Sequence, residues 1–177
     1  MKKSILIAAG LLVAAAPAFA QSLGEKTGVN SMLGVTPATA DFVKEAASSD
    51  MFEIQSSQLA LQNSDEPTKA FATQMIADHE KTTGEIKALV QGGKVKAEIP
   101  TAMLPSHQSM FDKLKGLKGA DFTKQYHDDQ VTAHKDAVSL YQRYAKGGDN
   151  EPLKMMASQN VPALEHHLQM AQDLDKK

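Results

Sequence analysis

Apolar residues recur at the spacing of an α-helix in four long blocks, at about residues 41–62, 66–91, 120–146 and 151–175. Strand signals are nearly absent from the same stretch of sequence. Each block gathers its apolar side chains on one face, and a helix of that kind must bury its apolar stripe against another element. The pattern therefore predicts an all-α fold.

Two of the connections between these blocks are short and one is long. Residues 63–67 and 146–152 each carry cap-forming residues and a proline near a helix start, and short connections make the joined helices antiparallel neighbours. Residues 92–119 are long enough to run the length of a bundle, with a short helix expected from Ser106 to Lys115. We therefore predict a ferritin-like antiparallel four-helix bundle with one long crossover containing a short helix.

The first twenty residues have the pattern of a secretory signal peptide. Lys2 and Lys3 precede an apolar stretch, and residues 18–20 (Ala-Phe-Ala) match the small-x-small sequence that signal peptidase cleaves. Residues 21–40 are rich in Gly, Ser and Thr without periodicity, which is typical of a flexible leader. The helical domain is then expected to occupy residues 41–177.

The composition argues against several classes of protein. The chain has no cysteine, so no disulfide and no thiol nucleophile is available. Removal of the signal peptide would leave 17 basic and 21 acidic residues without a long run of one charge, so neither nucleic acid nor an anionic membrane surface is expected as a partner. No later stretch approaches the length of a membrane span, and no nucleophile elbow, phosphate-binding loop or zinc-protease motif is present.

Each of the four expected helices places one metal-capable side chain in its apolar stripe: Glu53, His79, His134 and His167. Burying a carboxylate or an imidazole is costly unless the group is paired, hydrogen-bonded or coordinated to a metal. Three imidazoles and one carboxylate suit one divalent transition metal, such as zinc, copper or iron. Such a site requires the four residues to share one level along the bundle.

A purely structural role accounts for the same four residues. Buried polar groups need hydrogen-bond partners whether or not they do chemistry, and Tyr126, Gln130 and Asn160 share the inward faces. The histidines could therefore be satisfied by one another, by these side chains or by water. The sequence leaves the structural and the metal-binding interpretations open.

Three segments together resemble a known family: residues 71–79 (FATQMIADH), the run from Tyr126 through Gln130 to His134, and residues 164–168 (LEHHL). The pattern is similar to family 4142 of the domains of unknown function, and the resemblance covers about residues 38–175. Members are exported bacterial proteins, often labelled predicted outer membrane proteins, with a ferritin-like helical fold. The resemblance implies a Gram-negative cell envelope, with the protein periplasmic or peripherally associated with the outer membrane, and implies no established activity.

Ferritin-like di-iron proteins give only a partial match. Their centre uses a Glu on each of two helices and a Glu-x-x-His motif on each of the other two. Glu53, His79 and His167 fit three of these positions, but Ile76 and Leu164 stand where the motifs need glutamate. A standard di-iron centre is therefore not expected, and a mononuclear or degenerate site is the metal-binding alternative.

Taken together, these features favour a non-enzymatic cell-envelope protein with a binding or stress-related role, because the inward polar residues do not make a complete catalytic set. The alternative is a metal-binding or metal-dependent redox protein that uses Glu53, His79, His134 and His167. Other envelope proteins or a second copy of the chain are the expected partners.

Overall fold

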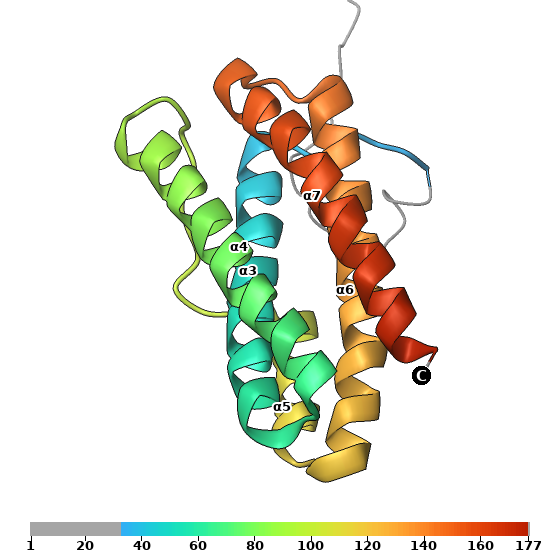
Figure 1. Ribbon diagram of the computed structural model, residues 1–177. Coiled ribbons are helices and arrows are strands. Elements are labelled where there is room, and N and C mark those ends of the chain that lie inside the picture. The colour runs from blue at the N-terminus through green and yellow to red at the C-terminus, as the bar shows by residue number, and fades with distance from the viewer. Residues whose placement is uncertain (1–32, 177) are drawn as a thin grey trace, which may run out of the picture.

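The computed structural model describes residues 33–176, which form helices, turns and one long crossover (Figure 1). The helices are α3 (Thr39–Asn63), α4 (Glu66–Gln91), α5 (Pro105–Lys115), α6 (Gly119–Gly147) and α7 (Glu151–Asp175). The expected signal peptide and most of the expected leader lie outside the described residues.

Helices α3, α4, α6 and α7 form a bundle in which each helix runs antiparallel to its two neighbours (Figure 1). The hairpins α3–α4 and α6–α7 are the most extensive contacts, and the two hairpins meet along the seams α3–α6 and α4–α7. The α4–α7 seam is the least extensive of the four. These findings confirm the all-α class, the four-helix bundle and the crossover that contains a short helix.

Side-chain caps fix the starts of α4 and α7 after the two short turns. The Asp65 carboxylate accepts a hydrogen bond from the Thr68 amide at 3.0 Å, and the Asn150 side chain accepts one from the Leu153 amide at 3.1 Å. A proline occupies the first turn of both helices, where its missing N–H costs nothing. Each cap stabilises its helix by about 1 kcal/mol.

The crossover starts at a glycine pair that ends α4. Gly93 has a φ of 71°, in the left-handed region that glycine adopts without strain. This turn lets the amides of Lys94 and Val95 donate to the Leu89 carbonyl at 3.0 and 3.1 Å. The chain then leaves the end of α4 and returns along the bundle to α5 (Figure 1).

Helix α5 is anchored to α3 through Ser48. The Ser48 hydroxyl accepts a hydrogen bond from the Leu104 amide at 2.7 Å and lies 2.7 Å from Nδ1 of His107. The His107 ring stacks on Phe52 with ring centroids 5.9 Å apart, and Leu114 is fully buried. The short helix α5 therefore packs against one side of α3.

The segment before α3 packs against α6. Arg143 donates from Nη1 to the Val35 carbonyl at 2.6 Å, and the Thr36 hydroxyl donates to the Arg143 carbonyl at 3.5 Å. Pro37 is buried, and α3 begins at Thr39. The last part of the expected leader is thus held on the bundle.

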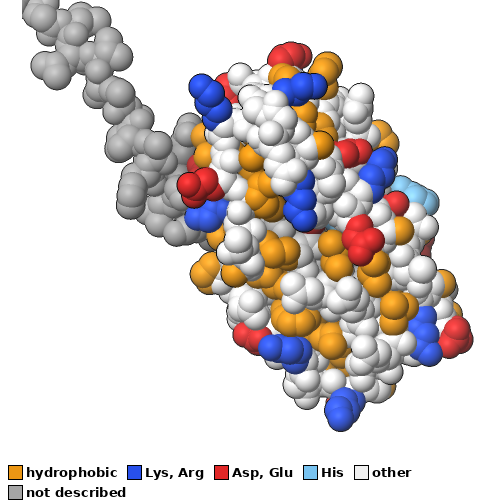
Figure 2. All heavy atoms as spheres, turned by 90° about the vertical axis from the view of Figure 1, so that its left-hand side faces the viewer, with side chains coloured by type: hydrophobic (Ala, Val, Ile, Leu, Met, Phe, Trp, Pro, Cys, Tyr) orange, Lys and Arg blue, Asp and Glu red, His pale blue; other side chains and the backbone are white. Residues whose placement is uncertain are grey.

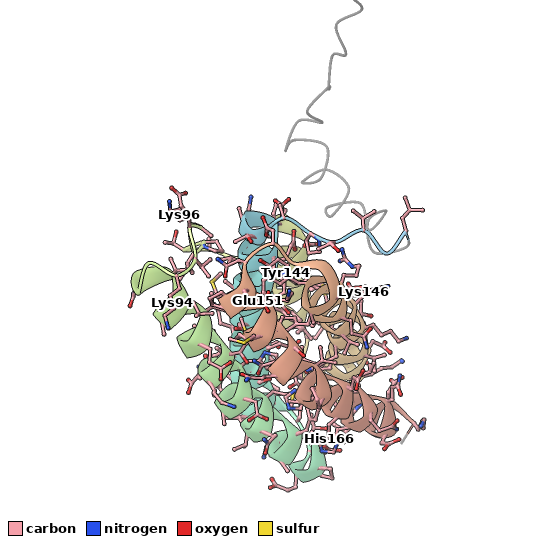
Figure 3. All side chains as sticks on the ribbon, turned by 90° about the horizontal axis from the view of Figure 1, so that it is seen from above. Lys94, Lys96, Tyr144, Lys146, Glu151 and His166 are labelled. Carbon is pink, nitrogen blue, oxygen red and sulfur yellow. The ribbon has the colours of Figure 1, made fainter. Side chains whose placement is uncertain are left out.

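Two apolar clusters form the core, one toward each end of the bundle. The first lies toward the α6–α7 turn, where Tyr144 is labelled in Figure 3, and includes Phe42 stacked on Tyr144 with ring centroids 4.3 Å apart. The second lies toward the α3–α4 turn and includes Phe71 and Phe122. Each fully buried large side chain stabilises the fold by about 1.5–3 kcal/mol. The two clusters leave a layer between them that is not apolar.

The face formed by α4 and the crossover carries basic and acidic side chains interspersed with hydrophobic groups (Figure 2). The exposed large hydrophobic side chains of the described segment, Leu33, Leu61 and Met155, come from three different parts of the chain. No helix within residues 33–176 has the length and apolar character needed to cross a membrane.

Candidate metal centre

The layer between the two apolar clusters consists of buried polar side chains from all four long helices. None of them is more than 8% exposed. They are Ser49, Asp50 and Glu53 of α3, His79 and Thr82 of α4, Gln130 and His134 of α6, and His167 of α7. Because each buried polar or ionisable group costs free energy unless it is compensated, the partners of these groups decide what the layer does.

Three histidines from three helices meet in this layer. The ring centroids of His79, His134 and His167 lie 5.5 to 5.8 Å apart in all three pairs. One ligand nitrogen from each ring lies within 4.8 Å of the other two. The helices α4, α6 and α7 therefore place three of the four residues chosen from the sequence at one level of the bundle.

Each ring is held through one nitrogen by an oxygen acceptor. Nδ1 of His79 lies 2.8 Å from Oδ1 of Asp50, and Nε2 of His167 lies 2.9 Å from Oδ2 of Asp78. Nδ1 of His134 lies 2.9 Å from the carbonyl oxygen of Gln130, one turn earlier on α6. Carboxylate and carbonyl oxygens accept, so in each case the histidine donates its N–H, which fixes the tautomer of a neutral ring.

The opposite nitrogen of each ring is left without a hydrogen bond within residues 33–176. Nε2 of His79, Nε2 of His134 and Nδ1 of His167 are buried and have no hydrogen-bond partner among the described residues. A buried nitrogen without a partner costs free energy, and here the three rings that carry such nitrogens lie within 5.8 Å of one another, centroid to centroid. Histidine ligands of metal ions characteristically donate their other N–H to a carboxylate or a backbone carbonyl, which is the arrangement of all three rings.

The surroundings keep two of the rings neutral. Burial and, to a smaller extent, the neighbouring His79 together lower the pKa of His134 to about 3. Burial also lowers the pKa of His167, against the opposing effect of Asp78. For His79, burial lowers the pKa, but the hydrogen bond and charge of Asp50, together with the charges of Glu53 and Asp78, outweigh burial and raise it. A neutral imidazole is the form that coordinates a metal.

Glu53 lies beside the three histidines and is not a member of their cluster. It is 1% exposed, and its Oε1 is 3.8 Å from Nδ1 of His134, the nitrogen that donates to the Gln130 carbonyl. Its Oε2 has no hydrogen-bond partner in the described part of the chain. Burial raises the pKa of Glu53 to about 7, partly offset by His79 and Gln130. The sequence placed Glu53 among the ligands, whereas the fold places it behind one of them.

A small cavity lies next to the cluster, between α4 and α7. Its volume is about 40 Å³, somewhat more than the roughly 30 Å³ that one water molecule occupies in the liquid. His79 and His167 form part of its wall, together with Asp78, Thr82, Asn160 and Ala163. Two of the three candidate ligands are therefore reached from this cavity.

Sequence reasoning did not assign a role to Asp50. Asp50 is 2% exposed and accepts hydrogen bonds from His79 and, at 3.0 Å, from the Thr83 hydroxyl. The signal was present in the sequence, because Asp50 precedes Glu53 by three residues and so shares its helix face. Asp78 is partly exposed at the edge of α4, and its carboxylate accepts a hydrogen bond from His167.

The side chains proposed as structural partners of the histidines bond elsewhere. The Tyr126 hydroxyl lies 2.8 Å from the Ser57 hydroxyl, and the Asn160 amide donates to Glu85 at 2.8 Å and to the Met156 carbonyl at 3.0 Å. Gln130 contributes its backbone carbonyl to His134, and its own Nε2 donates to Ser56 at 3.4 Å. The unpartnered histidine nitrogens are not satisfied by these groups.

The fold and the site define an all-α helical-bundle protein with a buried three-histidine cluster. The chain belongs to the family described as "Domain of unknown function (DUF4142)", whose model matches residues 24–174. A solved structure described as "CopM in the Cu(II)-bound form" has a similar fold, with a TM-score of 0.65 at 16% sequence identity over 80% of this chain and 97% of that one. No curated protein matches the sequence.

Proposed function

We propose that this protein binds one divalent transition-metal ion through His79, His134 and His167. The observation that carries the proposal is the meeting of three buried histidines, each with one nitrogen held by an acceptor and the other without a partner in the described part of the chain. A structural polar cluster would be expected to pair these nitrogens with donors, and donors are missing from the described surroundings.

The donor set and the nearby charges suit a dication. Neutral imidazoles bind zinc, copper, iron and nickel, and three of them leave a coordination position for another ligand. Three such nitrogens around a metal lie about 3.4 Å apart at usual bond lengths, so nitrogens now within 4.8 Å of one another need to close by up to about 1.4 Å. The carboxylates of Asp50, Asp78 and Glu53 surround the cluster and would balance the charge of the ion.

Copper(II) is the first metal to test, with zinc as its competitor. Copper(II) binds nitrogen ligands more tightly than the other divalent ions of the first transition series. The copper-bound form of a protein with a similar fold supports the same choice. Iron is a weaker candidate, because Ile76 and Leu164 stand where a di-iron centre needs carboxylates.

We place this activity in the cell envelope and regard it as binding without turnover. The first twenty residues motivate export, and the family resemblance motivates a periplasmic or peripheral outer-membrane location. Among the described residues, no serine or threonine hydroxyl is hydrogen-bonded to the three histidines of the candidate cluster, as an activated nucleophile would be. Metal storage, transfer or sensing under stress fits such a site better than catalysis.

Metal titration of the purified protein tests the proposal. We expect about one copper(II) or zinc ion per chain, and loss of that ion in the separate variants His79→Ala, His134→Ala and His167→Ala. His166→Ala is the matched control, because His166 adjoins His167 in sequence but lies exposed on the outside of α7 (Figure 3). That variant should bind metal like the unmodified protein.

Spectroscopy separates a specific site from surface binding. Copper(II) held by the cluster should show nitrogen ligation in its electron paramagnetic resonance spectrum, and the signal should disappear in the three interior variants. The same binding constant in the interior variants and in His166→Ala would refute the site and leave the layer as a structural polar cluster.

A further inference from the structure

We propose that the cavity between α4 and α7 is the route by which the metal ion reaches and leaves the three-histidine site. The inference rests on the proposed function and adds a path to it. The cavity of about 40 Å³ borders His79 and His167 directly, and its wall is formed by α4 and α7 alone. An ion in the cavity is therefore next to two of its ligands.

The other directions from the cluster are filled by side chains. Along the bundle axis the two apolar clusters close both ends. On the α3 side, Asp50 and Glu53 are 2% and 1% exposed, and on the α6 side His134 and Gln130 have no exposed surface. A hydrated cation would have to displace core packing to arrive from any of these sides.

The α4–α7 seam should open more easily than the other three seams of the bundle. It is the least extensive of the four seams, and two polar bridges cross it, Asp78 to His167 at 2.9 Å and Asn160 to Glu85 at 2.8 Å. The side chains of Asp78 and Glu85 are 35% and 34% exposed. Hydrogen bonds to partly exposed carboxylates such as these exchange readily with water.

Two charged side chains line the cavity at this seam: Lys81, whose ammonium lies 3.7 Å from the carboxylate of Glu85, and Asp78. The Asp78 carboxylate is partly exposed and also holds the ring of His167. The Gln74 side-chain amide donates to the same carboxylate oxygen of Asp78 that accepts from His167. An arriving cation thus meets a carboxylate that is already connected to one of its ligands.

The absence of native cysteine allows a direct test of the route. Ala163 lines the cavity and is exposed, so a single cysteine introduced as Ala163→Cys can be modified with a bulky methanethiosulfonate reagent. Lys135→Cys is the matched control, because Lys135 follows His134 in sequence but lies exposed on α6, away from the seam. Stopped-flow spectroscopy would follow copper(II) uptake and its removal by a chelator, before and after modification and after reduction of the label.

We expect the label at position 163 to slow both uptake and release at least tenfold with an unchanged equilibrium affinity, and reduction to restore both rates. The label at position 135 should change neither rate. Unchanged uptake and release rates after labelling at position 163 would overturn the route. A loss of affinity without slower release would also overturn it, because it would mean that the label distorts the site. Absence of binding in the unlabelled protein would instead refute the proposed function itself.

Discussion

Asp50 and Asp78 hold two of the three histidine rings, and they do so from different environments. Asp50 is inside the bundle and accepts two hydrogen bonds, whereas Asp78 is partly exposed at the α4–α7 seam. A carboxylate behind a ligand histidine orients the ring and makes it a better donor to the metal. At the scale of single residues, the ring nitrogen that donates to a carboxylate therefore indicates a ligand histidine as much as the nitrogen that would bind the metal.

Replacing Asp50 by Asn should weaken metal binding by 10- to 100-fold, because Asn keeps the size of the side chain but loses the negative charge behind His79. Competition with a chromophoric chelator would give the affinity. Thr83→Val serves as the control, since it removes the other hydrogen bond to Asp50 without touching His79. An affinity equal to that of the unmodified protein in Asp50→Asn would show that Asp50 has only a structural role.

Replacing Glu53 by Gln should stabilise the metal-free protein at neutral and alkaline pH. Burial raises the pKa of Glu53 from 4.5 to about 7, so its ionised form disfavours folding, and this loss of stability develops as the pH rises from 4.5 to 7. We expect a gain on the order of 1–3 kcal/mol at pH 8 that vanishes at pH 4.5. Urea unfolding at the two pH values measures the gain in stability. A gain that does not change with pH would contradict the raised pKa of Glu53.

At the scale of secondary-structure elements, α5 shows how the crossover is fixed to the bundle. Its His107 stacks on Phe52 and contacts the Ser48 hydroxyl, while Leu114 fills the core below. Burial lowers the pKa of His107 to about 4, so the ring is neutral at ordinary pH. The contacts that hold α5 on the bundle therefore favour the neutral form of His107.

This arrangement predicts a pH-dependent contribution to stability from α5. Neutral His107 stabilises the fold fully above pH 6.5, and that contribution is lost as the pH falls toward 4, because the unfolded chain binds the proton more readily. In His107→Leu the decline of stability between pH 6.5 and 4 should be shallower by up to about 1.4 kcal/mol per pH unit. If denaturant titrations show the same loss of stability with falling pH in His107→Leu and in the unmodified protein, His107 does not titrate in this way.

At the scale of the whole molecule, the three-histidine cluster joins the two hairpins. His79 belongs to the α3–α4 hairpin, and His134 and His167 belong to the α6–α7 hairpin. A metal at the cluster would therefore link the hairpins across the middle of the bundle, between the two apolar clusters. Such a link stabilises the folded chain because the unfolded chain does not assemble the site.

Metal binding should accordingly raise the melting temperature. At a free metal concentration one hundred times the dissociation constant, the gain is about 2.7 kcal/mol, which corresponds to roughly 5–10 °C for a domain of this size. Thermal unfolding followed by circular dichroism, with copper(II), zinc, iron and manganese in turn, measures the shift. His79→Ala should show no shift, and His166→Ala should show the full one. An equal shift in both variants would point to binding outside the cluster.

The periodicity of apolar residues was sufficient to determine the helices, because the spacing of 3.6 residues per turn is a local property of the chain. It predicted the inward direction of Glu53, His79, His134 and His167 for the same reason, and all four are buried. Position along the bundle depends on how one helix slides against the next, and that is decided only by packing between residues distant in sequence. The tertiary structure therefore decided that the three histidines meet, that Glu53 stands behind His134, and that Asp50 and Asp78 hold the rings.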